Sequence, residues 1–191
     1  MEPELITPTA PRPAGRTVFT QDWSHLTFIH WAVDPELVAP FMPTGVVPDV
    51  FEGQSYVALV PFAMEHIGLL GTPAVPYFGS FLETNVRLYG VDQLGRRGVV
   101  FCSLEAARLL TVAFTRFTTG LPYLWARMRM ERNDHGNDHT VRYTTRRRWP
   151  GPRGASSTVH VAIGDVIEPS PLEQFLTARW GLFLPDRKGR T

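Results

Sequence analysis

The sequence is almost without lysine. Of its 19 lysine and arginine residues, only Lys188 is a lysine, and it lies in the C-terminal stretch 185–191. Enzymes that form a Schiff base with a carbonyl substrate need a lysine amine as the nucleophile. The body of the chain has no lysine, which excludes an internal Schiff-base site.

Cysteine is nearly absent as well, because Cys102 is the only one in the chain. One cysteine permits neither an intrachain disulfide nor a metal site built from several thiolates. Its apolar neighbours, Val99 to Phe101 and Leu104, predict a buried thiol with a packing role.

Two further absences concern location and partners. Residues 1–17 have no positively charged start followed by an apolar core, as a signal peptide would, and no apolar run reaches membrane-spanning length. The net charge is +1, so no strong field attracts nucleic acid or a membrane surface. We therefore expect a cytoplasmic protein with no nucleic-acid partner and no membrane partner.

The composition predicts a globular chain with a short arm. The 191 residues suit one domain with a sizeable core, and 43% of them are hydrophobic. Prolines among small and polar residues predict a flexible N-terminal arm over 1–17. Residues 18–191 are then expected to form a single domain.

The most informative stretch is 81–89, because its polar and apolar residues alternate strictly. A strand sends successive side chains to opposite faces. One face therefore carries Glu83, Asn85, Arg87 and Tyr89, and the other carries apolar residues and a threonine. Two interpretations remain open, namely a sheet with one wet face, or a polar pocket inside a barrel or cone.

Other segments carry the same strand signals. We expect strands over 18–33, 46–51, 56–64, 98–105, 123–131, 141–149 and 157–163. Short helices are expected after Asp34 and Ser170, and a further helix over 106–117. This order predicts an α+β fold, in which a curled, barrel- or cone-like antiparallel sheet is flanked by a few helices. The apolar loop 66–78 is expected to serve as a lid or as a contact surface.

A set of short motifs resembles a known family. In chain order they are Trp23, His30-Trp31, Asp34-Pro35-Glu36, Pro43-Thr44-Gly45, Val60-Pro61-Phe62, Glu83-x-Asn85-Val86-Arg87-x-Tyr89, Ser103-Leu104-Glu105-Ala106 and Leu121-Pro122-Tyr123. Together they resemble the uncharacterised YqjF-like family, a domain-of-unknown-function family of the acetoacetate decarboxylase-like superfamily. This resemblance covers the chain from about Thr20 onward and implies a closed, cone-like antiparallel sheet around an internal cavity.

The resemblance to the decarboxylases also suggests individual roles. Their Tyr-x-Glu motif resembles 81–83, which puts Glu83 in the cavity, and their arginine before the lysine motif resembles Arg116. The two lysines of that motif are replaced by Tyr123 and Leu124, so the imine chemistry does not carry over. The family usually continues past the final helix with further strand. Two alternatives remain open, namely that this chain lacks the family's last strands, or that its last strand is supplied otherwise.

The strand alternation over 81–89 and the family resemblance together predict the candidate site. We expect Glu83 and Tyr123 as acid–base groups. The expected substrate-binding residues are Arg87, Asn85, Tyr89, Arg116 and His30. No cofactor and no metal are expected, since the polar stretch 133–139 has neither calcium-loop spacing nor a helical histidine pair.

Two functions remain open at this stage. The first is binding or transformation of a small carboxylate or keto compound, with lyase- or isomerase-like chemistry if the protein is an enzyme. The second is a non-catalytic structural or protein-interaction domain that keeps only the fold. A homo-oligomer is compatible with either.

Overall fold

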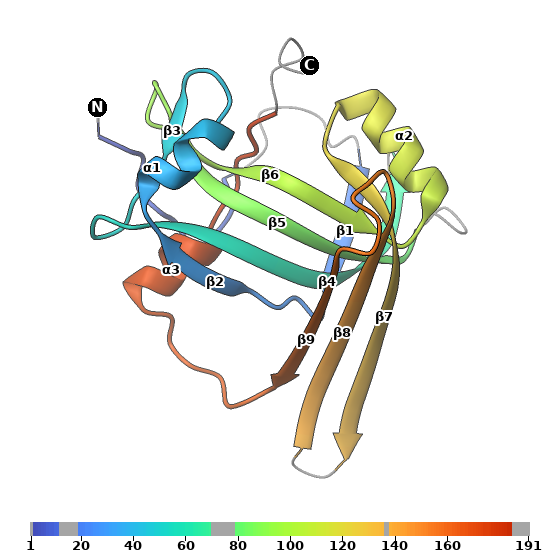
Figure 1. Ribbon diagram of the computed structural model, residues 1–191. Helices are drawn as coiled ribbons and strands as arrows, with labels where there is room; N and C mark the ends of the chain where they lie inside the picture. Colours follow the sequence, from blue (N-terminus) through green and yellow to red (C-terminus); the bar gives the residue numbers. More distant parts are fainter. Residues whose placement is uncertain (1, 12–18, 70–78, 136–137, 185–191) are drawn as a thin grey trace.

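The computed structural model describes residues 2–11, 19–69, 79–135 and 138–184, and its centre is one large sheet (Figure 1). The strands are β1 (Phe19–Ser24), β2 (Ile29–Val33), β3 (Val46–Pro48), β4 (Ser55–Leu69), β5 (Phe81–Asp92), β6 (Arg97–Ala106), β7 (Tyr123–His135), β8 (Asp138–Trp149) and β9 (Ser156–Ala162). The helices are α1 (Pro35–Val38), the 3-10 turn η1 (Ala39–Phe41), α2 (Leu109–Thr119) and α3 (Pro171–Thr177). The predicted α+β class is confirmed.

The sheet runs in the order β1-β4-β5-β6-β7-β8-β9, with β2 added to β4 and β3 added to β5. Every pairing is antiparallel except β6 with β7, which is parallel. The expectation of an all-antiparallel sheet is therefore wrong at this joint. The reason is the crossover through α2, which returns the chain so that β7 starts beside Leu104 and runs parallel to the last three residues of β6.

The sheet curls over one of its faces. Thr84 on β5 and Thr145 on β8 are separated by two strands in the sheet, yet their hydroxyl oxygens lie 3.1 Å apart. Tyr143 of β8 packs in one cluster with Leu59 of β4. Within the described ranges the last strand, β9, does not pair with β1 or β2, so the expectation of a closed cone or barrel is wrong.

Glu83, Asn85, Arg87 and Tyr89 lie on the face opposite to Thr84. That face is buried by the largest apolar cluster of the chain, to which Phe62 and Phe175 belong. The row of polar side chains is therefore neither in bulk solvent nor inside the curl. Arg87 and Tyr89 lie beneath α3, and Glu83 lies beside Tyr123 at the start of β7. The interpretation of a wet face is wrong.

Local sequence signals account for the helix ends. The Asp34 side chain accepts a hydrogen bond from the Glu36 backbone and Pro35 takes the first helical position, as predicted. At α3, Ser170 and Glu173 form the predicted capping box. Gly120 ends α2 with a φ of 75°, a left-handed conformation that glycine adopts without a Cβ clash.

Residues 2–11 of the predicted arm contact the sheet. Glu4 accepts a hydrogen bond from the Arg97 backbone, and the Thr7 carbonyl accepts one from the indole of Trp180. Residues 12–17 of the arm lie outside the described residues, as do residues 70–78 of the predicted apolar loop. No described helix is both long enough and apolar enough to cross a membrane.

Cys102 differs from the prediction, because it is exposed. Arg87 pairs with Phe101 and Val86 pairs with Ser103, so Cys102 is the extra residue of a bulge in β6. The prediction of a buried thiol rested on apolar neighbours, and a bulge exposes this residue although those neighbours belong to a largely buried strand. Partial desolvation still raises the pKa of the Cys102 thiol above its ordinary value.

We predict that Cys102 reacts with a thiol reagent such as DTNB while the protein is folded. The reaction should be slow near neutral pH and accelerate as the pH rises, because the thiolate is the nucleophile and the thiol pKa is raised. Released thionitrobenzoate measures the rate, and C102S is the control that should not react. Reaction only after unfolding would contradict the exposed position.

Candidate functional site

Glu83 is a buried glutamate with a strongly raised pKa. Its side chain is buried beneath the large apolar cluster, and the Tyr123 hydroxyl donates a hydrogen bond to its Oε2 at 3.1 Å. Burial raises the Glu83 pKa from 4.5 to about 8, against smaller opposing effects of hydrogen bonds from Tyr123 and Asn85. Glu83 is therefore mainly protonated at neutral pH, which is uncommon for a glutamate.

Tyr123 reaches Glu83 because of the parallel joint between β6 and β7. It is the first residue of β7 and pairs with Leu104, so it lies on the Glu83 face. Burial, reinforced by the neighbouring Glu83, raises the Tyr123 pKa above its ordinary value, and the phenol stays protonated. Arg116 of α2 donates from Nη1 to the Tyr123 carbonyl at 3.1 Å, which holds the start of β7 against the helix.

Asn85 adds an amide beside this pair. It is buried, it lies two residues along β5 from Glu83, and its amide hydrogen-bonds to the Glu83 carboxyl. Among the described residues, its Oδ1 has no hydrogen-bond partner. A buried acceptor without a partner costs free energy, so this oxygen has the capacity to bind a donor.

Arg87, Tyr89 and His30 form a second group on the same face. Arg87 Nε donates to the Tyr89 hydroxyl at 3.2 Å, and the same hydroxyl lies 2.8 Å from His30 Nε2. Burial and the Arg87 charge lower the His30 pKa to about 4, so the imidazole is neutral at pH 7. A neutral imidazole can accept the Tyr89 proton, which gives this chain of hydrogen bonds a consistent direction.

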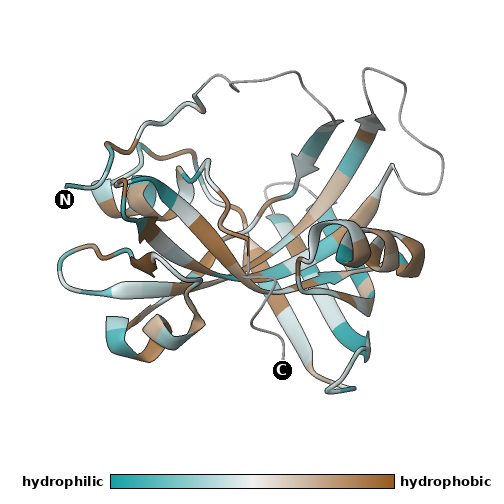
Figure 2. Ribbon diagram, turned by 90° about the horizontal axis from the view of Figure 1, so that it is seen from above, coloured by the Kyte–Doolittle hydropathy of each residue, from teal (hydrophilic) through white to brown (hydrophobic). Residues whose placement is uncertain are grey.

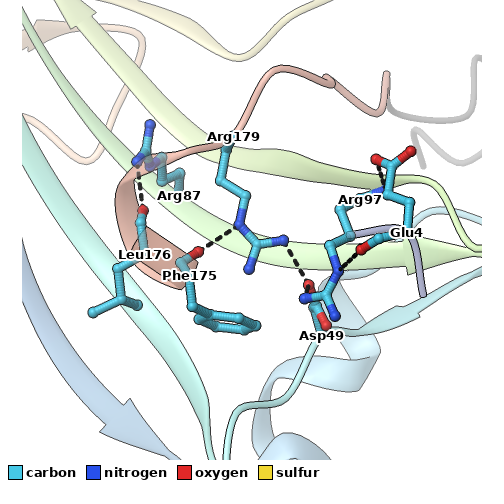
Figure 3. Close-up of polar contacts among 7 residues, drawn as sticks. All are labelled: Glu4, Asp49, Arg87, Arg97, Phe175, Leu176 and Arg179. Carbon is cyan, nitrogen blue, oxygen red and sulfur yellow. Dashed lines mark hydrogen bonds and ion pairs between the residues drawn. The ribbon is translucent and has the colours of Figure 1, made fainter. Parts of the chain in front are cut away.

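The arginines hold the C-terminal end of α3 against the sheet (Figure 3). Arg87 donates to the Leu176 carbonyl at 3.2 Å, and Arg179 Nε donates to the Phe175 carbonyl at 2.7 Å. The last carbonyls of a helix have no partners within the helix and carry a partial negative charge. Two guanidinium groups therefore satisfy these carbonyls in the interior.

Asp49 completes this arginine cluster. Its Oδ2 accepts from Arg179 Nη1 at 2.6 Å and from Arg97 Nη1 at 2.7 Å. The Arg179 and Asp49 side chains are only 1% and 2% exposed. Desolvation lowers the Arg179 pKa, while the Asp49 charge opposes this effect. Within the described part of the chain, Arg179 Nη2 has no hydrogen-bond partner.

The structure brings six of the seven predicted residues onto one face. Glu83, Tyr123 and Asn85 form one group, while Arg87, Tyr89 and His30 form the other. Arg116 contacts the Tyr123 backbone but lines a surface depression beside Val86 and Leu124. The sequence analysis missed Asp49 and Arg179, because their pairing spans 130 positions and follows no local spacing. It also missed the Glu105–Arg147 ion pair on the opposite face.

The described residues also form two surface depressions, and neither has Glu83 or Arg87 in its wall. One, of about 790 Å³, lies between α2 and the end of β8. The other, of about 600 Å³, is lined by Cys102, Ser103 and Arg147, among others. The expectation of a pocket open to Glu83 thus stays a prediction, and the Glu83 group is a buried polar cluster beside the start of β7.

Metal ligands do not gather in the described ranges. No group of three histidine, cysteine, aspartate or glutamate side chains there has the placement to hold an ion. In the polar stretch 133–139, Asp134 instead accepts from Arg132 at 2.7 Å and lies 3.3 Å from the His139 ring.

Comparisons with known proteins agree with this fold. Residues 20–191 match the sequence family DUF2071, described as an uncharacterized conserved protein. The uncharacterized protein YqjF of Bacillus subtilis (strain 168) is 28% identical over 176 residues, which is 90% of this chain and 69% of YqjF.

Solved structures show an acetoacetate decarboxylase-like fold. The enduracididine biosynthesis enzyme MppR superimposes with a TM-score of 0.58 at 13% identity, over 86% of this chain and 60% of that one. An acetoacetate decarboxylase-like enzyme from Sphingomonas wittichii RW1 gives a TM-score of 0.53 at 14% identity, over 77% and 59%. MppR has also been solved with pyruvate, at a TM-score of 0.54 and 14% identity over 84% and 61%. The chain thus spans about 60% of these structures, and the likeness concerns the fold alone.

We predict a pH-dependent stability difference between the parent and E83Q. An unfolded glutamate loses its proton near pH 4.5, whereas the folded parent keeps it to about pH 8. The folded parent binds more protons between these values, so its stability falls as the pH rises through this window. The advantage of E83Q should grow there by up to about 1.4 kcal/mol per pH unit.

Urea unfolding at several pH values measures this difference. E168Q, which changes an exposed glutamate, is the matched control and should follow the parent at every pH. A constant difference between E83Q and the parent would mean that Glu83 titrates normally.

We also predict that D49N unfolds much more easily than the parent. Removing the charge leaves two guanidinium groups without their carboxylate, and breaking a buried pair costs about 3 kcal/mol or more. D22N is the control, because Asp22 pairs with His66 on the surface, where ion pairs contribute little. Equal unfolding free energies for D49N and D22N would show that the arginine cluster does not stabilise the fold.

Proposed function

The chain belongs to the DUF2071 family of uncharacterized conserved proteins, and from its own residues we propose a function. We propose that it binds or transforms a small carboxylate or keto compound at Glu83. The observation that carries the proposal is the buried Glu83–Tyr123 pair with the unpartnered Asn85 oxygen beside it. Titratable groups with strongly shifted pKa values are typical of sites that handle protons.

The ligand class is argued from the charge and chemistry of this face. Arg87 lies four residues from Glu83 on one strand, so their Cα atoms are about 13 Å apart. Their long side chains can approach one small ligand from its two ends. A guanidinium suits a carboxylate through paired hydrogen bonds, and a protonated or ionised Glu83 suits a carbonyl or hydroxyl end. The MppR structure with pyruvate supports a small keto acid as the first probe.

Ligand binding would replace a contact that the protein now makes with itself. Arg87 currently donates to the Leu176 carbonyl, which is a neutral acceptor. A ligand carboxylate is a stronger, charged acceptor for the same N–H group. We therefore place the ligand where Leu176 now lies, with movement of α3 as the condition for entry.

If the protein is an enzyme, the residues fit enolisation without a lysine. The ionised fraction of Glu83 takes a proton from the carbon beside the ketone, and the C–H electron pair forms the C=C bond. The negative charge moves to the carbonyl oxygen, where the Tyr123 hydroxyl donates a hydrogen bond. Protonated Glu83 then returns the proton to carbon. A base with a pKa near 8 is stronger than an ordinary carboxylate and still partly ionised at neutral pH.

The alternative is a structural or interaction domain that keeps only the fold. One observation favours it, because Arg87 and Arg179 are already bound to the helix carbonyls of Phe175 and Leu176. In that case Glu83 and Tyr123 are a satisfied pair within a core.

We predict that the parent exchanges the methyl protons of pyruvate for deuterium in D₂O, measured by NMR. E83Q should abolish the exchange, because it keeps the shape but removes the base, and Y123F should slow it. R87A should weaken pyruvate binding by about one to two decades, the loss expected for one charge-assisted hydrogen bond. E168Q is the control, because it makes the same substitution at an exposed residue, and it should exchange like the parent.

Two further outcomes decide between the functions. Binding without exchange makes the protein a binder, and affinity alone then responds to R87A. Neither binding nor exchange with a folded parent rejects the proposal in favour of the structural domain. Borohydride added with pyruvate checks the reaction type, since a lysine-bound adduct in the mass spectrum would reveal imine chemistry.

A further inference from the structure

The groove between α2 and the end of β8 has two contrasting walls. Leu109, Leu110 and Ala113 of α2 form an apolar wall. Arg146, Arg148 and Arg153 line the other side together with Trp125 and Trp149. The lining contains no acidic residue, and the groove has a volume of about 790 Å³. A ligand for this groove must combine apolar surface with negative charge.

The arginines of the groove carry charge that the described chain does not neutralise. Arg147 is paired with Glu105, so its charge is already neutralised. Within the described ranges, no ion pair joins Arg146, Arg148 or Arg153 to a carboxylate. The Arg148 guanidinium instead lies 5.2 Å from the centre of the Trp125 ring. This contact steadies the guanidinium while leaving its N–H groups for an acceptor.

The apolar wall continues along α2 beyond the groove. Leu110, Phe114 and Phe117 recur at the spacing of one helix face and are 56%, 70% and 91% exposed. Apolar residues dominate the colour of α2 in Figure 2. The stripe from Leu110 to Phe117 is about 10 Å long, too long for a small ligand seated in the groove to cover. Exposed apolar stripes of this kind mark contact surfaces.

We propose that this groove and the exposed face of α2 bind an acidic amphipathic helix of a partner protein. The apolar stripe of the partner helix packs on Leu110, Phe114 and Phe117, and its carboxylates face Arg146, Arg148 and Arg153. Helix-in-groove recognition combines apolar anchors at helical spacing with a charged border in the same way. The proposal is independent of any ligand at Glu83, which lies in the interior.

Nucleic acid and a second copy of the chain match this groove less well than an acidic helix does. A nucleic acid would suit the arginines but would leave three large apolar side chains of α2 in water. A second copy of the chain would bring arginine to arginine if the two α2 helices met, because α2 carries no acidic residue. An acidic amphipathic helix matches both walls.

The test is a selection of phage-displayed peptides on the folded full chain, from a library of helical peptides with a fixed leucine stripe and varied flanking positions. Enriched peptides should carry aspartate or glutamate at the varied positions. R148E should weaken the best of them by about tenfold or more in fluorescence polarisation, with a matching loss at high salt. L110S should weaken the same peptide without changing the salt dependence.

R142E is the matched control, because Arg142 is exposed on the same strand but does not line the groove. It should leave the peptide affinity within about a factor of two, since an exposed charge outside a contact contributes little. Enrichment without acidic bias, no enrichment, or equal binding to R148E and the parent overturns the proposal. So does a labelled single-stranded oligonucleotide that binds more tightly than any peptide, or a dimer in sedimentation that F117S dissociates.

Discussion

The buried carboxylate of Asp49 is the contact on which the rest of the interior depends. It neutralises Arg179, and Arg179 together with Arg87 satisfies the last carbonyls of α3. This arrangement keeps Phe175 and Leu176 over Tyr89 and Arg87 on the polar face of β5. The dryness of that face raises the Glu83 pKa, because a carboxylate in contact with water would ionise near its ordinary value.

The pKa shift at Glu83 is opposite in direction to the shift that a Schiff-base lysine needs. A Schiff-base enzyme must lower the pKa of an amine so that it is neutral and nucleophilic. Here Tyr123 occupies the place that the family resemblance assigns to the first lysine, and the shifted group is an acid whose pKa is raised. The same desolvation that penalises an ammonium ion penalises a carboxylate, so one dry environment suits either chemistry. The seven candidate residues differ in how much hydrogen-bonding capacity their present contacts leave for a ligand. Asn85 Oδ1 has no described partner, whereas the Arg87 guanidinium is already engaged.

Much of the fold was predictable from local patterns, and most of the errors have a local physical reason. The alternation over 81–89 placed Glu83, Asn85, Arg87 and Tyr89 on one face, and the capping residues predicted where α1 and α3 begin. The bulge at Cys102 could not be predicted, since an extra residue in one strand depends on the register of its neighbour. The parallel joint of β6 and β7 and the open sheet depend on tertiary packing. No sequence pattern predicts the pairing of Asp49 with Arg179, because it depends on the burial of both side chains and not on their spacing.

The parallel joint has a consequence for how the chain assembles. Strands β4, β5 and β6 form one antiparallel meander, and β7, β8 and β9 form another, each from neighbours in sequence. Only three residue pairs, from Leu104–Tyr123 to Ala106–Trp125, join the two meanders within the described sheet. Contacts between sequence neighbours form quickly, whereas a parallel joint must wait for its crossover. The hydrogen bond between Tyr123 and Glu83 spans this joint, so these two side chains come together only when the two halves dock.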